Sequence, residues 1–176
     1  SKNQRIRIEM SRIHQLLFLV FFIIQAVGCG VYSPYGAQTS GAKTFAVMGF
    51  NPVNPLASAS SALLLTELMR DRIQRQSTLK LQSSNGELRF EADIVQWSVT
   101  PVNVQGDEVA ASNRLTIGIL MRYENSLDPS LSFERKFSRF ADYRSDQDLF
   151  SIEDQLVETI GEQLTQDVFN ATLGNW

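Results

Sequence analysis

The sequence has very few of the side chains on which most catalytic and metal sites depend. Its 176 residues include one cysteine and one histidine. A single cysteine excludes an internal disulfide and a cysteine-rich zinc site. His14 lies in an amino-terminal segment that we expect to be removed, so Ser-His-Asp catalysis, Cys-His catalysis and histidine metal sites are excluded from the rest of the chain. We therefore expect no enzyme activity and no metal.

Strong charge of one sign and long apolar runs are also missing. The formal net charge is -3 and 20% of the residues are charged, so a nucleic-acid partner is not expected. A hydrophobic content of 43% argues against a disordered chain. The longest unbroken apolar run, Leu16 to Ile24 (LLFLVFFII), is shorter than the roughly 20 apolar residues that cross a bilayer. The length suits one globular domain.

What is present at the amino terminus is typical of a lipoprotein signal peptide. Four basic residues (Lys2, Arg5, Arg7 and Arg12) precede the apolar run, and Ala26-Val27-Gly28-Cys29 follows it. This end resembles a bacterial lipobox, in which the thiol receives a diacylglyceryl group and cleavage falls before the cysteine. Ala26 replaces the commoner leucine. The alternatives are a buried core helix for the apolar run and a small buried cysteine at position 29. Met10 could be the true start, which would give the signal a more usual length.

This interpretation divides the chain into three parts. Residues 1–28 form the signal peptide, residues 29–42 form a lipidated tether, and residues 43–176 form a single domain. The expected cofactors are none apart from the covalent lipid on Cys29. Several acyl chains, at about 0.8 kcal/mol for each buried methylene, would hold the protein on a membrane.

Hydrophobic periodicity in the domain predicts a strand, a helix, a ladder of strands and a second helix. Asn54 and Pro55 are the expected start of the first helix, and Ser151 is a candidate N-cap of the last. Asn85-Gly86 predicts a turn with positive φ, and the alternation changes phase near Ile94 to Gln96, which predicts a bulge. The predicted segments are 43–50, 55–76, 78–83, 87–104, 110–125, 131–143 and about 151–169, with further turns at Gly106-Asp107 and Asp128-Pro129.

These segments predict an α+β fold. Two amphipathic helices pack on one face of an antiparallel or mixed sheet of about four to five strands, as a two-layer sandwich. Leu65, Met69 and Ile73 are spaced four apart in the first helix, and the last helix repeats this spacing from Ile152 to Val168. No internal repeat and no second domain are expected.

An ordered set of short motifs resembles one known family. The motifs, with the lipobox cysteine before them, are Phe50-Asn51-Pro52, Arg70-Asp71-Arg72-Ile73, Leu79 to Gly86, Val99-Thr100-Pro101-Val102, Asn113 to Ile117, Phe137 to Asp142 and Ile152 to Leu156. Together they are similar to the LptE-related lipopolysaccharide-assembly lipoproteins. The resemblance implies an outer-membrane, periplasm-facing lipoprotein that sits inside the lumen of an LptD-type β-barrel. It also implies that the pair delivers lipopolysaccharide to the outer leaflet, and that the lipoprotein helps the barrel assemble and can bind lipopolysaccharide.

Lipopolysaccharide is anionic, so its binding surface should offer arginine or lysine beside apolar area. The candidates in the strands are Arg89, Arg114, Arg122, Arg135, Lys136 and Arg139. Arg135, Lys136 and Arg139 are close enough in sequence for a local patch, with Lys136 on the other side of an extended strand. The alternative is a solvated sheet face on which these cations pair with Glu91, Asp93, Glu124 and Glu134.

Other features have two interpretations each. Trp97 could face the barrel wall or the core, and the aromatic residues from Phe133 to Tyr143 fit core and edge packing better than a lipid stripe. The carboxylates from Asp142 to Asp154 fit no Ca²⁺ loop and are better explained by the helix dipole. Gly161 could mark a close approach of strand or barrel backbone.

The rival functions are a membrane-tethered periplasmic lipid- or glycan-binding module and an accessory lipoprotein of another envelope complex.

Overall fold

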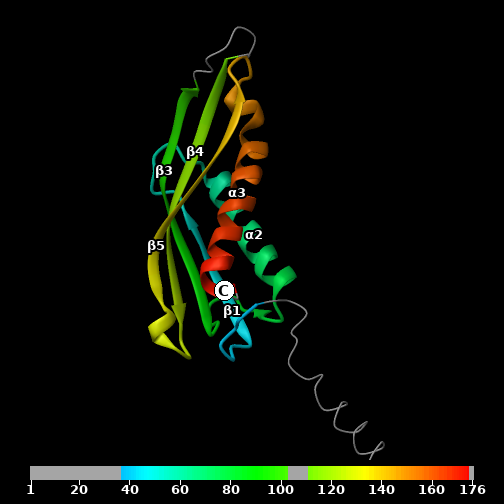
Figure 1. The fold of residues 1–176 in the computed structure, drawn as a ribbon, viewed down its shortest axis with the longest axis vertical. Helices are drawn as coiled ribbons and strands as arrows, with labels where there is room; N and C mark the ends of the chain where they lie inside the picture. Colours follow the sequence, from blue (N-terminus) through cyan, green and yellow to red (C-terminus); the bar gives the residue numbers. More distant parts are fainter. Residues whose placement is uncertain (1–36, 103–110, 175–176) are drawn as a thin grey trace, which may run out of the picture. The chain divides into compact units, whose positions relative to one another are not determined.

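Five strands form one sheet in the order β2-β1-β3-β4-β5, and two helices cover one of its faces (Figure 1). The computed structural model describes residues 37–102 and 111–174, so the signal peptide, Cys29 and the Gly106-Asp107 turn lie outside the described residues. The elements in chain order are β1 (Thr44–Asn51), α2 (Ala59–Gln76), β2 (Lys80–Leu81), β3 (Leu88–Val102), β4 (Ser112–Asn125), the 3-10 turn η1 (Pro129–Leu131), β5 (Phe133–Arg144) and α3 (Leu149–Leu173). This is the predicted α+β class.

The sheet is mixed. Strand β1 pairs in parallel with both β2 and β3, whereas β3, β4 and β5 pair antiparallel. The register between β3 and β4 shifts between Ile94 and Gln96. The bulge predicted from the change of phase is therefore confirmed, and it lets Trp97 return to the helix side after Ile94.

The core lies between the helices and the sheet. Alternate residues of β3 (Leu88, Phe90 and Ile94) are fully buried, because successive side chains of a strand point to opposite faces. The four-residue spacings of α2 and α3 place Met69 and Ile160 fully inside the same core. Trp97 is 5% exposed and belongs to this core, so core packing is the correct interpretation of that residue.

Both predicted helix starts are wrong. Helix α2 begins at Ala59, and Ser58 is its N-cap, because the Ser58 hydroxyl accepts a hydrogen bond from the Ser61 amide at 3.1 Å. The Asn54 side chain instead accepts from the Leu56 amide at 3.0 Å, which makes a local turn of the preceding loop. Helix α3 begins at Leu149, and its N-cap is Asp148.

The Asn85-Gly86 prediction is also wrong. Strands β2 and β3 both run parallel to β1, so no hairpin joins them. Positive φ among the described residues occurs at Ser40, Gly41 and Gly49. Gly86 meets a different need, because a Cβ there would lie 2.3 Å from the backbone carbonyl carbon of Phe45. Glycine is required at this position by close approach to β1.

The turn at Asp128-Pro129 is confirmed. Asp128 caps η1 by accepting a hydrogen bond from the Ser130 amide, and Pro129 occupies the first turn. Within the described residues, neither α2 nor α3 combines the length and the apolar composition that a membrane-crossing helix needs.

Candidate functional site

The six candidate cations lie on both faces of the sheet. Because Leu115 to Tyr123 alternate inward along β4, Arg114 and Arg122 face away from the helices. By the same register Arg89 and Lys136 share this outer face, which no described helix covers. Arg135 and Arg139 point to the helix side of β5. The six therefore do not form one surface.

Arg89 and Arg122 are neutralised by carboxylates directly across the strands. Arg89 lies opposite Glu124, and their charged atoms are 3.1 Å apart. Arg122 lies opposite Glu91 on one side and Glu134 on the other, and it also donates to Asp93 at 2.9 Å. The hydrogen bond from Arg122, and to a smaller extent the hydrogen bond from Asn51, lowers the pKa of Asp93. Arg89 and Arg122 therefore follow the alternative prediction, in which cations on a solvated sheet face pair with carboxylates.

Arg114 is held in the same way at the other end of the outer face. Its guanidinium donates two hydrogen bonds to Asp142, at 2.7 and 2.9 Å, and lies 3.7 Å from the centroid of the Phe140 ring. The hydrogen bonds that Arg114 donates to Asp142 raise the pKa of Arg114. Phe140 is 47% exposed, so this aromatic residue packs under a cation on the surface and not in the core.

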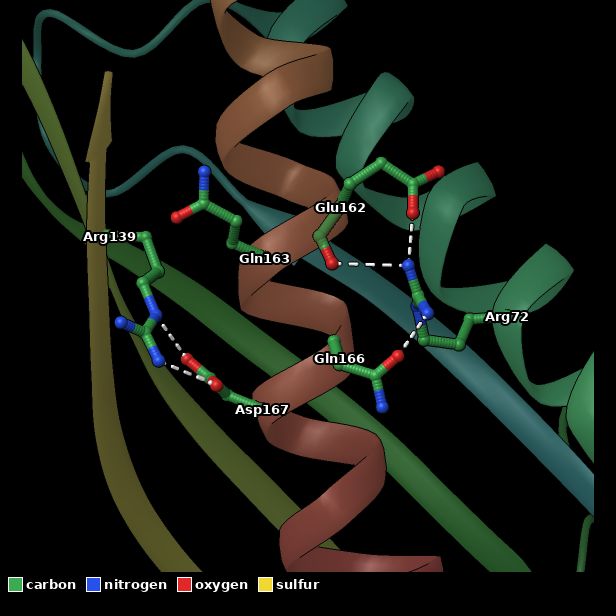
Figure 2. Close-up of a pocket in the computed structure, with 6 residues that line it drawn as sticks. All are labelled: Arg72, Arg139, Glu162, Gln163, Gln166 and Asp167. Carbon is green, nitrogen blue, oxygen red and sulfur yellow. Dashed lines mark hydrogen bonds and ion pairs between the residues drawn. The ribbon is translucent and has the colours of Figure 1, made fainter. Parts of the chain in front are cut away.

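Arg139 reaches from β5 to α3. It donates two hydrogen bonds to Asp167, at 2.6 and 2.8 Å, and Figure 2 shows this pair on one flank of α3. Lys136 lies on the opposite face of β5. The structure therefore does not bring Arg135, Lys136 and Arg139 together as one basic patch.

Arg135 and Lys136 differ from the other four candidates. Neither side chain has an ion pair among the residues that the structure describes. The Arg135 guanidinium lies 4.9 Å from the centroid of the Phe133 ring. Phe133 and Phe137 are partly buried and pack against the core, as expected for edge aromatics. This part of β5 thus combines available positive charge with apolar area.

Arg72, a buried arginine between the two helices, is not among the site residues predicted from the sequence. It is 8% exposed, and its guanidinium donates to the Thr165 hydroxyl at 3.0 Å and to the Glu162 carbonyl at 3.1 Å. It also contacts the side chains of Glu162 and Gln166 (Figure 2). The signal was present, because residue 72 lies seven after Leu65 and so falls on the buried stripe of α2.

A polar pocket of about 470 Å³ surrounds these pairs. Figure 2 shows its six lining residues, with Arg72 on α2, Arg139 on β5, and Glu162, Gln163, Gln166 and Asp167 on α3 between them. Both arginines are bonded to α3 carboxylates. The pocket therefore offers hydrogen bonds but little uncompensated charge, and it links the two helices and the edge strand.

Gly161 is the position at which a close approach is predicted. Gly161 does mark a close approach, but to α2: a Cβ there would lie 2.6 Å from Leu68 Cδ1 and 2.8 Å from Leu65 Cδ2. The described segments contain no group of three or more His, Cys, Asp or Glu side chains that could hold a metal ion.

Several solved structures are similar to this chain at low sequence identity. They include a minor lipoprotein from Acinetobacter baumannii (11% identity, TM-score 0.45, covering 76% of this chain and 97% of that chain). They also include a hypothetical protein from Chlamydia trachomatis (10%, 0.47, 74% and 98%) and the rare lipoprotein B from Shewanella oneidensis (12%, 0.39, 72% and 89%). A comparison with curated proteins gives no match.

The family model is the informative comparison. The model described as LptE, lipopolysaccharide-assembly, matches residues 42–172, which include all five strands and nearly all of both helices. The match confirms the resemblance read from the motifs. It implies a non-enzymatic lipoprotein with a role in lipopolysaccharide assembly. The chain belongs to the LptE lipopolysaccharide-assembly family.

Proposed function

We propose that this chain is the lipoprotein subunit of an outer-membrane lipopolysaccharide translocon. It occupies the lumen of an LptD-type β-barrel, helps that barrel to assemble and contacts lipopolysaccharide. The observation that carries the proposal is the family match over residues 42–172. The mechanism is shape complementarity and side-chain contact, without chemistry.

The proposal includes the anchor. Cleavage before Cys29 and acylation of its thiol and new amino terminus would attach the protein to the periplasm-facing leaflet of the outer membrane. Residues 29–42 would then serve as the tether and residues 43–176 as the domain that meets the barrel. The lipobox and the basic, apolar segment before it support this assignment.

Among the candidate cations, Arg135 and Lys136 are the best lipopolysaccharide contacts. Arg89, Arg114, Arg122 and Arg139 already hold carboxylates, so an anionic ligand would have to displace an existing partner. Lys136 lies on the outer face of this edge strand, whereas Arg135 lies on its helix side, beside the partly buried Phe133 and Phe137. A phosphate group and an acyl chain could be met there together, since both types of contact are in reach of one strand.

Depletion tests the proposal in cells. When synthesis of the protein is stopped, lipopolysaccharide on the cell surface should fall and the barrel should accumulate in a misassembled form. Expression of the unchanged protein from a second site should restore both. Normal surface lipopolysaccharide after complete depletion would reject the proposal.

Binding of lipopolysaccharide is tested separately with the lipid-free domain. Substituting both cations, R135E together with K136E, should weaken binding of purified lipopolysaccharide about tenfold or more, because each charge-assisted contact contributes about 1.5–3 kcal/mol. The control is R144E, which removes a β5 cation already bonded to Asp146. Equal affinities of the double variant and the control would reject these two residues as the contact.

A further inference from the structure

A groove lies between α2 and α3 on their exposed side. Leu63 and Leu64 of α2 line it from one side, and Asp154, Gln155 and Glu158 of α3 line it from the other. Its volume is about 580 Å³, within the range of about 300–1,000 Å³ that is usual for binding clefts. It is separate from the polar pocket around Arg72.

The groove contains an apolar side chain that is exposed and is not packed in the core. Leu63 lies in the second turn of α2 and is 61% exposed. One exposed leucine on a helix surface needs no explanation. Leu63 is different in that Leu64 adjoins it and a second helix forms the opposite wall, so a ligand side chain would be enclosed from two sides.

The α3 wall carries uncompensated negative charge. Helix α3 contains five acidic residues and no lysine or arginine. Glu162 and Asp167 hold arginines, and Glu153 accepts hydrogen bonds from the hydroxyls of Ser58 and Ser61. Asp154 and Glu158 have no ion pair or side-chain hydrogen bond within the described part of the chain.

The helix dipole does not account for these two acids. Its stabilisation of negative charge is confined to the first turn, and the first turn of α3 contains no acidic residue. Asp154 and Glu158 are instead four residues apart, a spacing at which like charges destabilise a helix by about 0.2–0.5 kcal/mol. A cation supplied from outside the chain would relieve this repulsion.

We propose that this groove docks a cationic peptide segment of a protein partner. One bulky apolar side chain of the segment lies against Leu63 and Leu64, and two lysine or arginine side chains meet Asp154 and Glu158. The acidic wall repels phosphate, so lipopolysaccharide and other anionic lipids are excluded as occupants. This inference goes beyond the proposed function, because it defines a partner by chemistry and holds or fails whether or not that partner is the barrel.

The spacing of the two acids restricts the segment further. Side chains four apart on a helix have Cβ atoms about 5–6 Å apart. The complementary cations would therefore lie at i and i+4 of a helical segment, or at i and i+2 of an extended one, whose rise is about 3.3 Å for each residue.

The test uses the full-length, lipidated protein in cells, with a photo-crosslinking amino acid in place of Leu63. Mass spectrometry of the crosslinked peptide should identify a protein segment with at least two lysines or arginines near an apolar residue. The same probe at Leu131, which is 44% exposed in η1, should not give that peptide. A crosslink to lipid, to this chain itself or to a segment without basic residues would overturn the proposal, and so would no crosslink.

Charge reversal completes the test. With the probe at position 63, E158K should lower the yield of the crosslinked peptide about tenfold, the change expected for the loss of one charge-assisted contact. The matched control is D71K, which makes the same charge change at an exposed α2 residue outside the groove. Circular dichroism should show that both variants remain folded. An equal yield from E158K and D71K would overturn the proposal.

Discussion

At the scale of single residues, the availability of a charged side chain for a ligand depends on the ion pairs that it already makes. Arg122 lies among three carboxylates, whereas Lys136, its near neighbour on the outer face, lies opposite Leu120 and has no ion pair in the described residues. The sequence alone predicts both residues equally as lipopolysaccharide contacts. Only the strand register, which sets Glu91 and Glu134 opposite Arg122, separates them.

Arg72 should be the most important single charge for stability. R72A removes hydrogen bonds to Thr165 and the Glu162 carbonyl and leaves a gap between the helices. We expect a loss of about 1–3 kcal/mol in the free energy of unfolding, measured by urea denaturation. The control R75A removes an arginine that is 62% exposed and 3.9 Å from Glu162, and it should cost less than about 0.5 kcal/mol. Equal losses would contradict the buried role.

The pairing of Asp93 should appear as a pH dependence of stability. Its lowered pKa in the folded state means that it stabilises the fold above the unfolded pKa, and this contribution disappears as the pH falls through the folded value. D93N should therefore be less stable than the parent protein at pH 7, by about 1 kcal/mol or less. Urea denaturation between pH 7 and pH 3 should show the difference closing below about pH 4. A difference that stays constant over this range would contradict the pairing.

At the scale of elements, hydrophobic periodicity predicted those features of the helices and strands that depend on local sequence. The bulge near Val95 followed from a change of phase, because the side-chain period of a strand is two. The predicted helix start at Asn54-Pro55 is wrong because the same dipeptide suits a turn as well as a helix cap. In the structure the backbone N–H of Asn54 donates a hydrogen bond to the carbonyl oxygen of Ile94 in β3. The parallel pairing of β1 with β2 and β3 joins distant segments and has no local signal.

Gly161 tests the packing of α3 on α2. Alanine is about 1 kcal/mol better than glycine inside a helix, but its Cβ would overlap the ends of Leu65 and Leu68. Overpacking costs about 1–3 kcal/mol, so G161A should be less stable than the parent by about 1 kcal/mol in urea denaturation. The added substitution L68A should recover part of this loss, giving a positive coupling in the double-mutant cycle. A gain in stability from G161A alone would contradict the close contact.

At the scale of the whole molecule, the acids of α3 without an ion pair and the cations of β5 without an ion pair lie on different elements. Helix α3 carries acids without lysine or arginine, and β5 carries Arg135 and Lys136, two cations for which the described residues provide no ion pair. Such a separation would direct an anionic lipid to the edge strand and a cationic protein segment to the helices. The family resemblance could be read from the sequence, but this division of surfaces could not, because it depends on which charges pair across the sheet.

The proposed lipidation of Cys29 also concerns the whole molecule. C29S should abolish incorporation of radiolabelled palmitate and release the protein from the membrane fraction into the soluble periplasm, because no acyl chain would remain. Labelled palmitate and fractionation measure the two effects. A C29S protein that still incorporated palmitate would contradict the assigned site.

We propose that this chain is the lipoprotein partner of a lipopolysaccharide-export barrel. The most direct measurement is purification of the native, lipidated protein in mild detergent, followed by mass spectrometry of its stoichiometric partners. We predict one large outer-membrane barrel of the LptD type in equal amount. Recovery of the protein alone, or with a different stoichiometric partner, would contradict the claim.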